Sequence, residues 1–143
     1  MDLNRSRFLA RGLAGPEAVA WDPRGYLYAG TQDGFLHRID PGIGVRDVVA
    51  QLGGKLLGIL VDEEGSILVC NQDAACVQRV SPSDGVVSTV TSGSPEALLS
   101  TPNYLAQDSR GILYVSDSGD WDAQDGRIFA HLPSGETLLL ETA

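Results

Sequence analysis

The sequence is poor in cysteine, in basic residues and in long apolar runs. Of its 143 residues, 2 are Cys and 10 are Lys or Arg, against 19 Asp or Glu, so the formal net charge is −9. This balance argues against nucleic acid and anionic membranes as partners, because both are bound by basic surfaces. No apolar run approaches the roughly 20 residues that span a bilayer. The acidic surface is compatible with cation binding, although most such carboxylates serve solubility.

The two cysteines and the N-terminus bear on the cellular compartment. The opening sequence MDLNRSRFLARGLAG lacks the long apolar core of a signal peptide, so we expect a cytoplasmic protein with reduced thiols. Cys70 and Cys76 flank NQDAA, a predicted turn between two strands. Two small apolar side chains are the favoured interpretation, and a disulfide across the hairpin is the alternative. A zinc site is not expected, since the spacing is wrong and no second ligand pair exists.

Apolar residues and glycine are plentiful. The apolar fraction is 43%, and 17 Gly and 7 Pro are spread along the chain. A packed core is therefore expected, built from short strands with many turns between them. The length is that of one domain.

One sequence unit occurs three times. Each copy contains an Asp-x-x-Gly turn, at residues 22–25, 62–65 and 108–111. In such a turn the Asp side chain bonds the following backbone, and the glycine supplies a positive φ. A short apolar stretch precedes each turn and a β-rich run follows it. A third run then ends at a proline, and the three prolines are in register: Pro41, Pro82 and Pro133.

The repeat predicts an all-β fold, a β-propeller with three four-stranded blades. Each unit has four short strands and roughly 40–45 residues, which is the size of a propeller blade. A helical alternative fails, because the runs are short and β-branched or aromatic, and Gly or Pro interrupts them. The predicted blades span about 15–53, 54–93 and 101–143 within one half-propeller domain. Residues 1–14 are predicted to add an extra outer strand.

These segments resemble a known family. GPEAVAWDPRGYLYAGTQDGFLHRID resembles the first blade of the strictosidine synthase-like group, within the wider SMP-30/gluconolactonase and paraoxonase-like propellers. LGGKLLGILVDEEGSILVCNQDAACVQRVSP is similar to their second blade, and TPNYLAQDSRGILYVSDSG to their third. The resemblance implies a six-bladed propeller with a divalent cation, commonly calcium, at the top of the central channel. Members of the family include lactonases, esterases and a condensing enzyme.

Three blades are too few to close a ring of roughly 4–8 blades, and an unclosed set leaves unpaired edges. We therefore expect a homodimer, three blades plus three, related by two-fold symmetry. The extra N-terminal strand would then complete the last blade of the partner. A truncated or decayed fragment is the alternative.

The residues that precede the first strand of each unit are the candidate site. They are Glu17, Leu57 and Asn103. The resemblance implies that Glu17 and Asn103 are cation ligands, and their oxygens suit Ca²⁺. The family takes its other ligands from later blades, so a homodimer would supply a second Glu17 and Asn103 instead. The alternative is that both side chains only satisfy local backbone groups.

Further candidates lie on the same rim. The second strands end at Thr31, Asn71 and Asp117, and Asp117 is a weaker candidate for a metal ligand or a partner to one. A turn-forming role is its alternative. We expect Trp121, Asn71 and Leu57 to line a pocket for a small-molecule ligand. The acidic loop that contains Trp121 lacks EF-hand spacing, so it is predicted to be a solvated loop.

Catalytic residues cannot be identified in the sequence. It contains no Ser-His-Asp arrangement, nucleophile elbow or phosphate loop. His37 and His131 fall in third strands, away from the expected axis. The paraoxonase-like lactonases carry a channel histidine where this chain has Leu56 and Leu57. The favoured function is a divalent-cation-dependent hydrolase of lactones or simple esters. The alternative is a non-catalytic propeller module that binds a small molecule or a protein partner.

Overall fold

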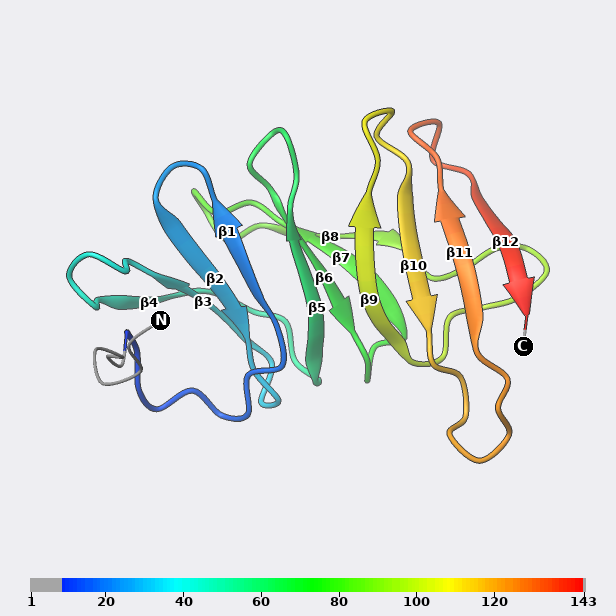
Figure 1. Cartoon of the computed structure of the whole chain (residues 1–143), viewed down its shortest axis with the longest axis horizontal. Coiled ribbons are helices and arrows are strands. Elements are labelled where there is room, and N and C mark those ends of the chain that lie inside the picture. Colours follow the sequence, from blue (N-terminus) through cyan, green and yellow to red (C-terminus); the bar gives the residue numbers. More distant parts are fainter. Residues whose placement is uncertain (1–8, 143) are drawn as a thin grey trace, which may run out of the picture.

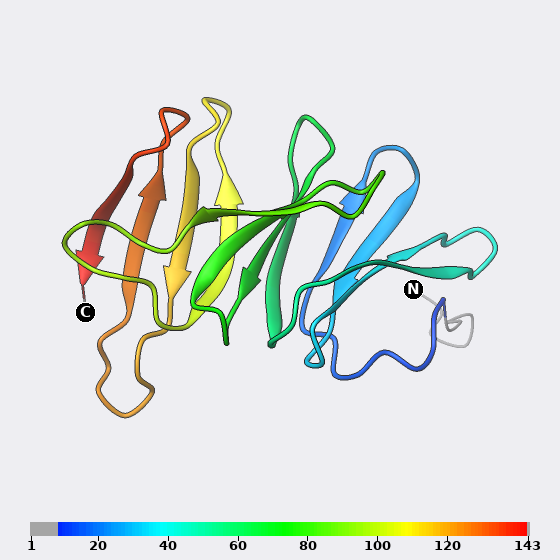
Figure 2. The same cartoon turned by 180° about the vertical axis from the view of Figure 1, so that it is seen from behind.

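Three antiparallel sheets of four strands follow one another along the chain (Figure 1; Figure 2). The computed structural model describes residues 9–142. The first sheet consists of β1 (Val19–Asp22), β2 (Tyr26–Gly30), β3 (Phe35–Ile39) and β4 (Arg46–Gln51). The second consists of β5 (Leu56–Val61), β6 (Ile67–Asn71), β7 (Cys76–Val80) and β8 (Val87–Thr91). The third consists of β9 (Pro102–Gln107), β10 (Leu113–Asp117), β11 (Arg127–His131) and β12 (Thr137–Thr142).

Consecutive strands pair within every sheet, so each sheet is the four-stranded unit that the repeat predicts. The described part of the chain has no helix with the length and apolar character needed to span a membrane.

Asp-x-x-Gly turns close the first hairpin of each sheet, as predicted. Asp22 O accepts a hydrogen bond from Gly25 N at 2.8 Å, and Gly25 has a φ of 102°. The Asp22 carboxylate also accepts a bond from Arg24 N at 2.9 Å. The same Gly-to-Asp backbone bond forms at 62–65 and 108–111, at 3.0 Å in each. The repeated motif therefore fixes the same bend three times.

The inner strands β1, β5 and β9 lie next to one another, and the later strands of each sheet extend outward (Figure 1). Two apolar cores fill the spaces between neighbouring sheets. The core between the first and second sheets includes Tyr28, Leu36, Leu56, Ile67 and Val69. The core between the second and third includes Leu68, Cys70, Val77, Val115 and Phe129. Because side chains alternate across a strand, β6 contributes to both cores.

The cysteines are two free, buried thiols. Cys70 lies opposite Val77, and Cys76 lies opposite Asn71 in the β6–β7 pair. Residues directly opposite each other share a face, so the two thiols leave the sheet on opposite faces. Burial raises the pKa of Cys70 to about 12. Both cysteines thus serve as small apolar side chains.

The first sheet has one face without a neighbouring sheet among residues 9–142. Val19, Ile59 and Leu105 occupy the same place in the three repeats, three residues before the Asp of the turn. Ile59 is 5% exposed and Leu105 is 3% exposed, but Val19 is 61% exposed. Trp21, on the same face as Val19, is 57% exposed. Among residues 9–142, no sheet packs on this face of the first sheet. The corresponding face of the second sheet is covered by β1–β4.

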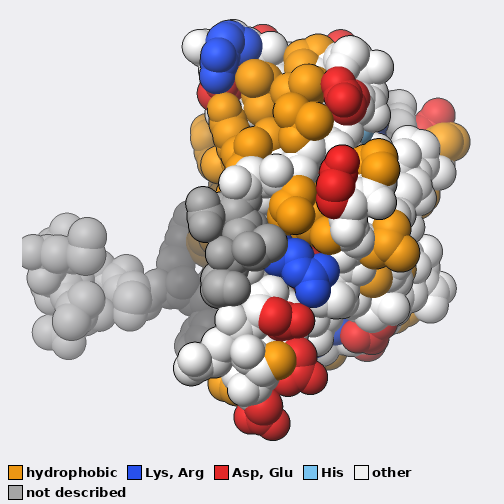
Figure 3. All heavy atoms as spheres, turned by 90° about the vertical axis from the view of Figure 1, so that its right-hand side faces the viewer, with side chains coloured by type: hydrophobic (Ala, Val, Ile, Leu, Met, Phe, Trp, Pro, Cys, Tyr) orange, Lys and Arg blue, Asp and Glu red, His pale blue; other side chains and the backbone are white. Residues whose placement is uncertain are grey.

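The third sheet has the opposite face open. Leu36, Val77 and Ile128 are equivalent, five residues before the prolines, and they are 0%, 0% and 39% exposed. Tyr104 and Leu138 are further apolar side chains on this face and are 60% and 38% exposed. Figure 3 looks onto this side of the molecule, where hydrophobic side chains gather between a few charged groups. The two ends of the arrangement therefore expose opposite sides of the same repeat.

The segment before β1 runs beside the first sheet. Of the predicted extra strand over residues 1–14, residues 1–8 lie outside the described residues, and residues 9–14 form no strand. Instead, Gly12 O accepts a bond from Arg46 Nη1 at 2.7 Å, and Ala14 O accepts one from Gln32 N at 2.9 Å. An apolar hollow of about 390 Å³ lies between this segment and the open face of the first sheet.

Candidate ligand groove

A groove of about 330 Å³ lies where the inner strands begin. It is at the lower end of the sheets in Figure 1, where the long β10–β11 loop projects. Its lining brings together four of the side chains that the sequence singles out, namely Glu17, Leu57, Asn103 and Trp121. Three sheets and one loop therefore converge on a single place.

Glu17 and Asn103 each present an oxygen to this groove. Glu17 is exposed just before β1, and its Oε1 accepts a bond from Gln32 Nε2 at 3.4 Å. Asn103 in β9 donates from Nδ2 to Ser118 Oγ at 3.0 Å. Within residues 9–142, Oε2 of Glu17 and Oδ1 of Asn103 take part in no hydrogen bond. Both oxygens are available to a ligand.

A close approach of β5 and β9 positions Asn103. A Cβ atom on Gly58 would lie 2.7 Å from Asn103 O and 2.8 Å from Tyr104 Cα, so only glycine fits there. The β5–β6 register shifts between Leu56 and Ile59. Leu57 falls within this irregularity, where it is 8% exposed and belongs both to the groove and to the second core.

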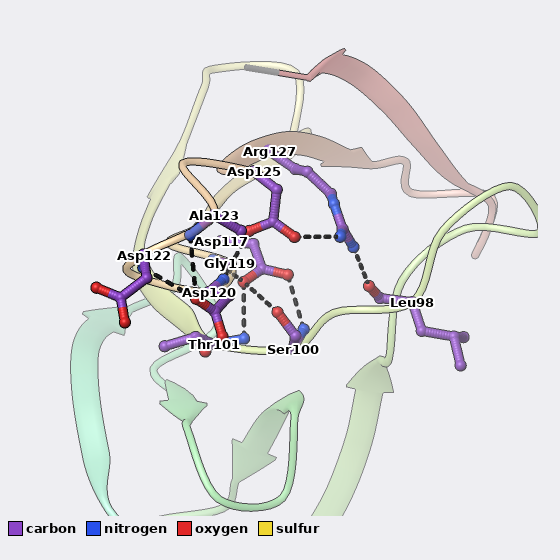
Figure 4. Close-up of polar contacts among 10 residues, drawn as sticks. All are labelled: Leu98, Ser100, Thr101, Asp117, Gly119, Asp120, Asp122, Ala123, Asp125 and Arg127. Carbon is purple, nitrogen blue, oxygen red and sulfur yellow. Dashed lines mark hydrogen bonds and ion pairs between the residues drawn. The ribbon is translucent and has the colours of Figure 1, made fainter.

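Asp117 lies beneath the groove rather than in its lining. The side chain is 2% exposed, and its oxygens accept bonds from Ser100 N (2.7 Å), Thr101 N (2.7 Å) and Gly119 N (3.0 Å) (Figure 4). The Ser100 hydroxyl adds a longer bond at 3.3 Å. The carboxylate is thus occupied in holding the start of β9 and the β10–β11 loop, which matches the turn-forming alternative.

Asn71 is equivalent to Asp117 and is used in the same way. It is fully buried, its Nδ2 donates to Gly53 O at 2.7 Å, and its Oδ1 accepts a bond from Ala74 N at 3.1 Å. The groove is lined instead by the next residue along each chain segment, Gln72 and Ser118. Successive side chains of a strand point to opposite faces, so a shift of one residue exchanges a structural residue for a groove residue.

The β10–β11 loop carries Trp121 at the groove, with 86% of its surface exposed. The carboxylates of Asp120 and Asp125 accept hydrogen bonds from the backbone of the loop itself (Figure 4). Asp125 Oδ1 accepts a bond from Asp120 N at 2.6 Å, and Asp120 Oδ1 accepts one from Asp122 N at 2.9 Å. Arg127 joins Asp125 Oδ2 at 3.3 Å. These contacts fit the predicted solvated loop better than a calcium loop.

Sequence reasoning missed Lys55 and Thr101, which also line the groove. They precede Leu57 and Asn103 by two residues each, so they hold the same position in their repeats. The period-two alternation of a strand places such residues on the same side as the candidates already named. Counting back two residues from Leu57 and from Asn103 would therefore have identified Lys55 and Thr101 from the sequence.

The histidines lie away from the groove. His37 is 6% exposed in β3, and burial together with the nearby Arg46 lowers its pKa. His131 in β11 borders a different groove, beside the Asp-x-x-Gly turns at the opposite ends of the strands, and shares a 2.9 Å hydrogen bond with Thr137 Oγ1. Across residues 9–142, no three His, Cys, Asp or Glu side chains gather in a way that could hold a metal ion.

Comparison with known proteins gives a partial match in sequence and an extended one in structure. Residues 2–39 match the model of the strictosidine synthase-like, N-terminal family. No curated protein sequence shows a significant match to the chain.

The structural matches are to propellers. A gluconolactonase from Xanthomonas campestris superposes with a TM-score of 0.80 at 17% identity, over 94% of this chain and 50% of that chain. A structural-genomics target described as a gluconolactonase family protein gives 0.77 at 17% identity, over 93% and 50%. A streptogramin B lyase gives 0.69 at 14% identity, over 90% and 41%.

The chain spans about half the length of these solved structures. The expected resemblance is thereby confirmed. The chain is similar to the strictosidine synthase-like, N-terminal family over residues 2–39 and has, over nearly its whole length, the fold of half of a six-bladed gluconolactonase-type propeller.

Proposed function

We propose that the groove holds a divalent cation, Ca²⁺ in the first instance, and hydrolyses lactones or simple esters. The observation that carries the proposal is the meeting of Glu17 and Asn103, from two different sheets, in one groove with Leu57 and Trp121. The structural likeness to a gluconolactonase supports the same reaction class.

The oxygens in the groove suit such a cation in kind. Hard cations take carboxylate and amide oxygens, and Glu17 and Asn103 each have one free of other bonds among the described residues. In number they are too few, because Ca²⁺ takes roughly 6–8 oxygen ligands. Asp117 is not available, since its oxygens already accept backbone hydrogen bonds.

The residues of the groove would then have distinct roles. Glu17 and Asn103 would hold the cation, and Ser118 keeps the amide of Asn103 in orientation by accepting from its Nδ2. Leu57 and Trp121 would pack on the acyl part of the substrate and limit access of water. A bound cation would polarise the carbonyl group and stabilise the negative charge that develops on its oxygen.

A Glu17→Gln variant tests the proposal. Losing one carboxylate ligand should weaken calcium binding by about tenfold or more, because affinity in such sites follows the number of charged ligands. Calcium binding is measured by calorimetry, and turnover is measured on a panel of aliphatic lactones and esters. The control is Glu63→Gln, an exposed acid within the 62–65 turn at the opposite ends of the strands. Unchanged turnover in Glu17→Gln, or in excess chelator, would rule the mechanism out.

A second copy of the chain would complete both the ring and the ligand set. The open face of the first sheet carries Val19 and Trp21, and that of the third carries Tyr104, Ile128 and Leu138. The positions equivalent to Val19 and Ile128 in the other repeats are buried between sheets, so we infer that the two open faces are the two sides of one interface that a second copy would form. Two-fold pairing of half-propellers would cover all four open faces and bring two copies of Glu17 and Asn103 to one axis.

Light scattering on a sizing column, with and without calcium, tests this assembly. We expect a dimer for the wild-type chain and a shift toward monomer for Val19→Asp. The matched control is Val86→Asp, because Val86 and Val19 are both 61% exposed but Val86 lies in the β7–β8 turn, away from both open faces. A wild-type monomer at all concentrations would rule out completion of the ring by a second copy of the chain.

A non-catalytic binding module is the second candidate function. It is favoured by the lining of the groove, which among residues 9–142 includes no histidine and one acidic residue, Glu17. If Glu17 holds a cation, no other carboxylate of the groove remains to act as a general base. Ligand binding without turnover across the lactone and ester panel would support this candidate.

A further inference from the structure

We propose that Lys55 binds a carboxylate group of the ligand, so that the groove takes small organic acids in preference to their neutral analogues. This inference deepens the proposed function, because it assigns a substrate class to the same groove. It rests on a different residue and on charge rather than on cation ligands.

Lys55 is the only lysine in the sequence, and it lies in the groove. Its backbone is fixed on both sides: its N donates to Asp73 Oδ2 at 3.1 Å, and its O accepts a bond from Gln72 N at 2.8 Å. The residue is half-buried. Among residues 9–142 its ammonium group takes part in no ion pair or hydrogen bond.

The arginines differ from Lys55 in this respect. Each arginine of the described segment is engaged by other groups of the protein, and five pair with a carboxylate of their own repeat: Arg24 with Asp22, Arg38 with Asp47, Arg79 with Asp62, Arg110 with Asp108 and Arg127 with Asp125. The chain has 19 acidic residues against 10 basic ones, so partners for a cation are abundant. Among residues 9–142 there is one ammonium group, that of Lys55, and it lies in the groove without an ion pair.

The rest of the lining shows how an acid would be oriented. Among the described residues that line the groove, Lys55 is the one basic residue and Glu17 the one acidic residue, so a carboxylate is attracted to the first and repelled by the second. An ammonium group is a compact point charge that pairs well with carboxylates. Leu57 and Trp121 offer apolar surface for the body of the ligand. The substrate class is therefore an ester or lactone that also carries a free carboxylate on an apolar or aromatic body, and a simple aromatic carboxylate represents its charged end.

Benzoate and benzamide form a matched pair of probes, since they have similar shape and differ in charge. Binding to the full chain is measured by calorimetry in buffer without calcium. Benzoate should bind at least about tenfold more tightly than benzamide, which is the usual worth of a charge-assisted hydrogen bond. Lys55→Gln should abolish this difference, whereas Lys55→Arg should retain most of it because a guanidinium also pairs with carboxylates.

The single lysine also permits a direct readout. Reductive methylation with ¹³C labels Lys55 and the N-terminal amine only, and the Lys55 signal is identified by its absence from Lys55→Arg. Benzoate should shift this signal saturably, and benzamide should leave it unchanged. Arg38→Gln, which removes the same charge from an exposed ion pair of the first sheet, is the control and should bind benzoate like wild type.

Equal affinity for the two probes, no binding of either, or an unchanged preference in Lys55→Gln would each overturn the inference. These outcomes are separate from a failure of the proposed hydrolase. The probe titrations involve neither calcium nor turnover, so a preference for benzoate would stand even if every lactone and ester remained unreacted.

Discussion

The second sheet is covered by a neighbour on both faces, whereas the third is covered on one. In β6 all five residues from Ile67 to Asn71 are buried, but in β10 burial alternates from Leu113 to Asp117. The sequence follows this difference. Where β6 has Leu68 and Cys70, β10 has Tyr114 and Ser116 at the equivalent places. Between β6 and β10, the face that is open in the third sheet becomes more polar, while the face that is covered in both sheets remains apolar.

The largest expected effect separates the two faces of one strand. Phe129 is 0% exposed between the second and third sheets, and its neighbour Ile128 is 39% exposed on the open face. Phe129→Ala should lower the free energy of unfolding by about 3–5 kcal/mol, because it leaves a cavity. Ile128→Ala should cost less than about 1 kcal/mol in the monomer. Urea unfolding measures both, and equal losses would contradict the distinction between covered and open faces.

The next prediction separates the groove from the structure beneath it. Asp117→Ala leaves the amides of Ser100, Thr101 and Gly119 without their acceptor, so it should destabilise the fold by about 2–4 kcal/mol. Asn103→Ala, on an exposed residue, should change stability by about 0.5 kcal/mol or less. The urea midpoints give the comparison. A stable Asp117→Ala variant would mean that the carboxylate is free for another role.

A third prediction concerns the approach of the inner strands. Gly58→Ala places a Cβ atom 2.7 Å from Asn103 O, so β9 must move away from β5, at a cost of about 1–3 kcal/mol. The same substitution at Gly126 meets nothing nearer than 3.5 Å and should be nearly neutral. Thermal unfolding tests both variants. Equal melting temperatures would show that the contact between β5 and β9 is loose.

The smallest expected effect is a pH dependence from the open side of the first sheet. His37 is buried there, its Nδ1 has no hydrogen-bond partner among the described residues, and burial together with Arg46 lowers its pKa below the ordinary 6.5, while Asp33 opposes the shift. The unfolded state therefore takes up a proton first, so stability should fall as pH drops below about 6.5.

His37→Gln should make that decline shallower between about pH 6.5 and 5, as measured by urea midpoints at several pH values. His131, whose pKa is also lowered by burial, would contribute to what remains of the slope. An identical pH profile in the variant would show that His37 is accessible to protons in the folded chain.

The sequence allowed the three sheets, their turns and the meeting of Glu17 with Asn103 to be predicted, because the Asp-x-x-Gly turn and the in-register prolines repeat. It did not separate Asn71 and Asp117 from their neighbours Gln72 and Ser118. The reason is that the end of a strand is uncertain by a residue, and one residue changes the face. The sequence also did not predict that Lys55 lacks an ion pair among the described residues, since ion pairing depends on contacts between distant segments.

The complete burial of β6 also predicts the order in which the molecule opens. Backbone amides exchange with solvent when the segment around them unfolds locally, and the rate reports the free energy of that opening. β6 is packed by sheets on both sides and hydrogen-bonded to β5 and β7, so its amides should be the last to exchange. β4 and β8 lie at the outer edges of their sheets and should exchange first. Deuterium uptake would therefore rank the strands by how completely their neighbours cover them.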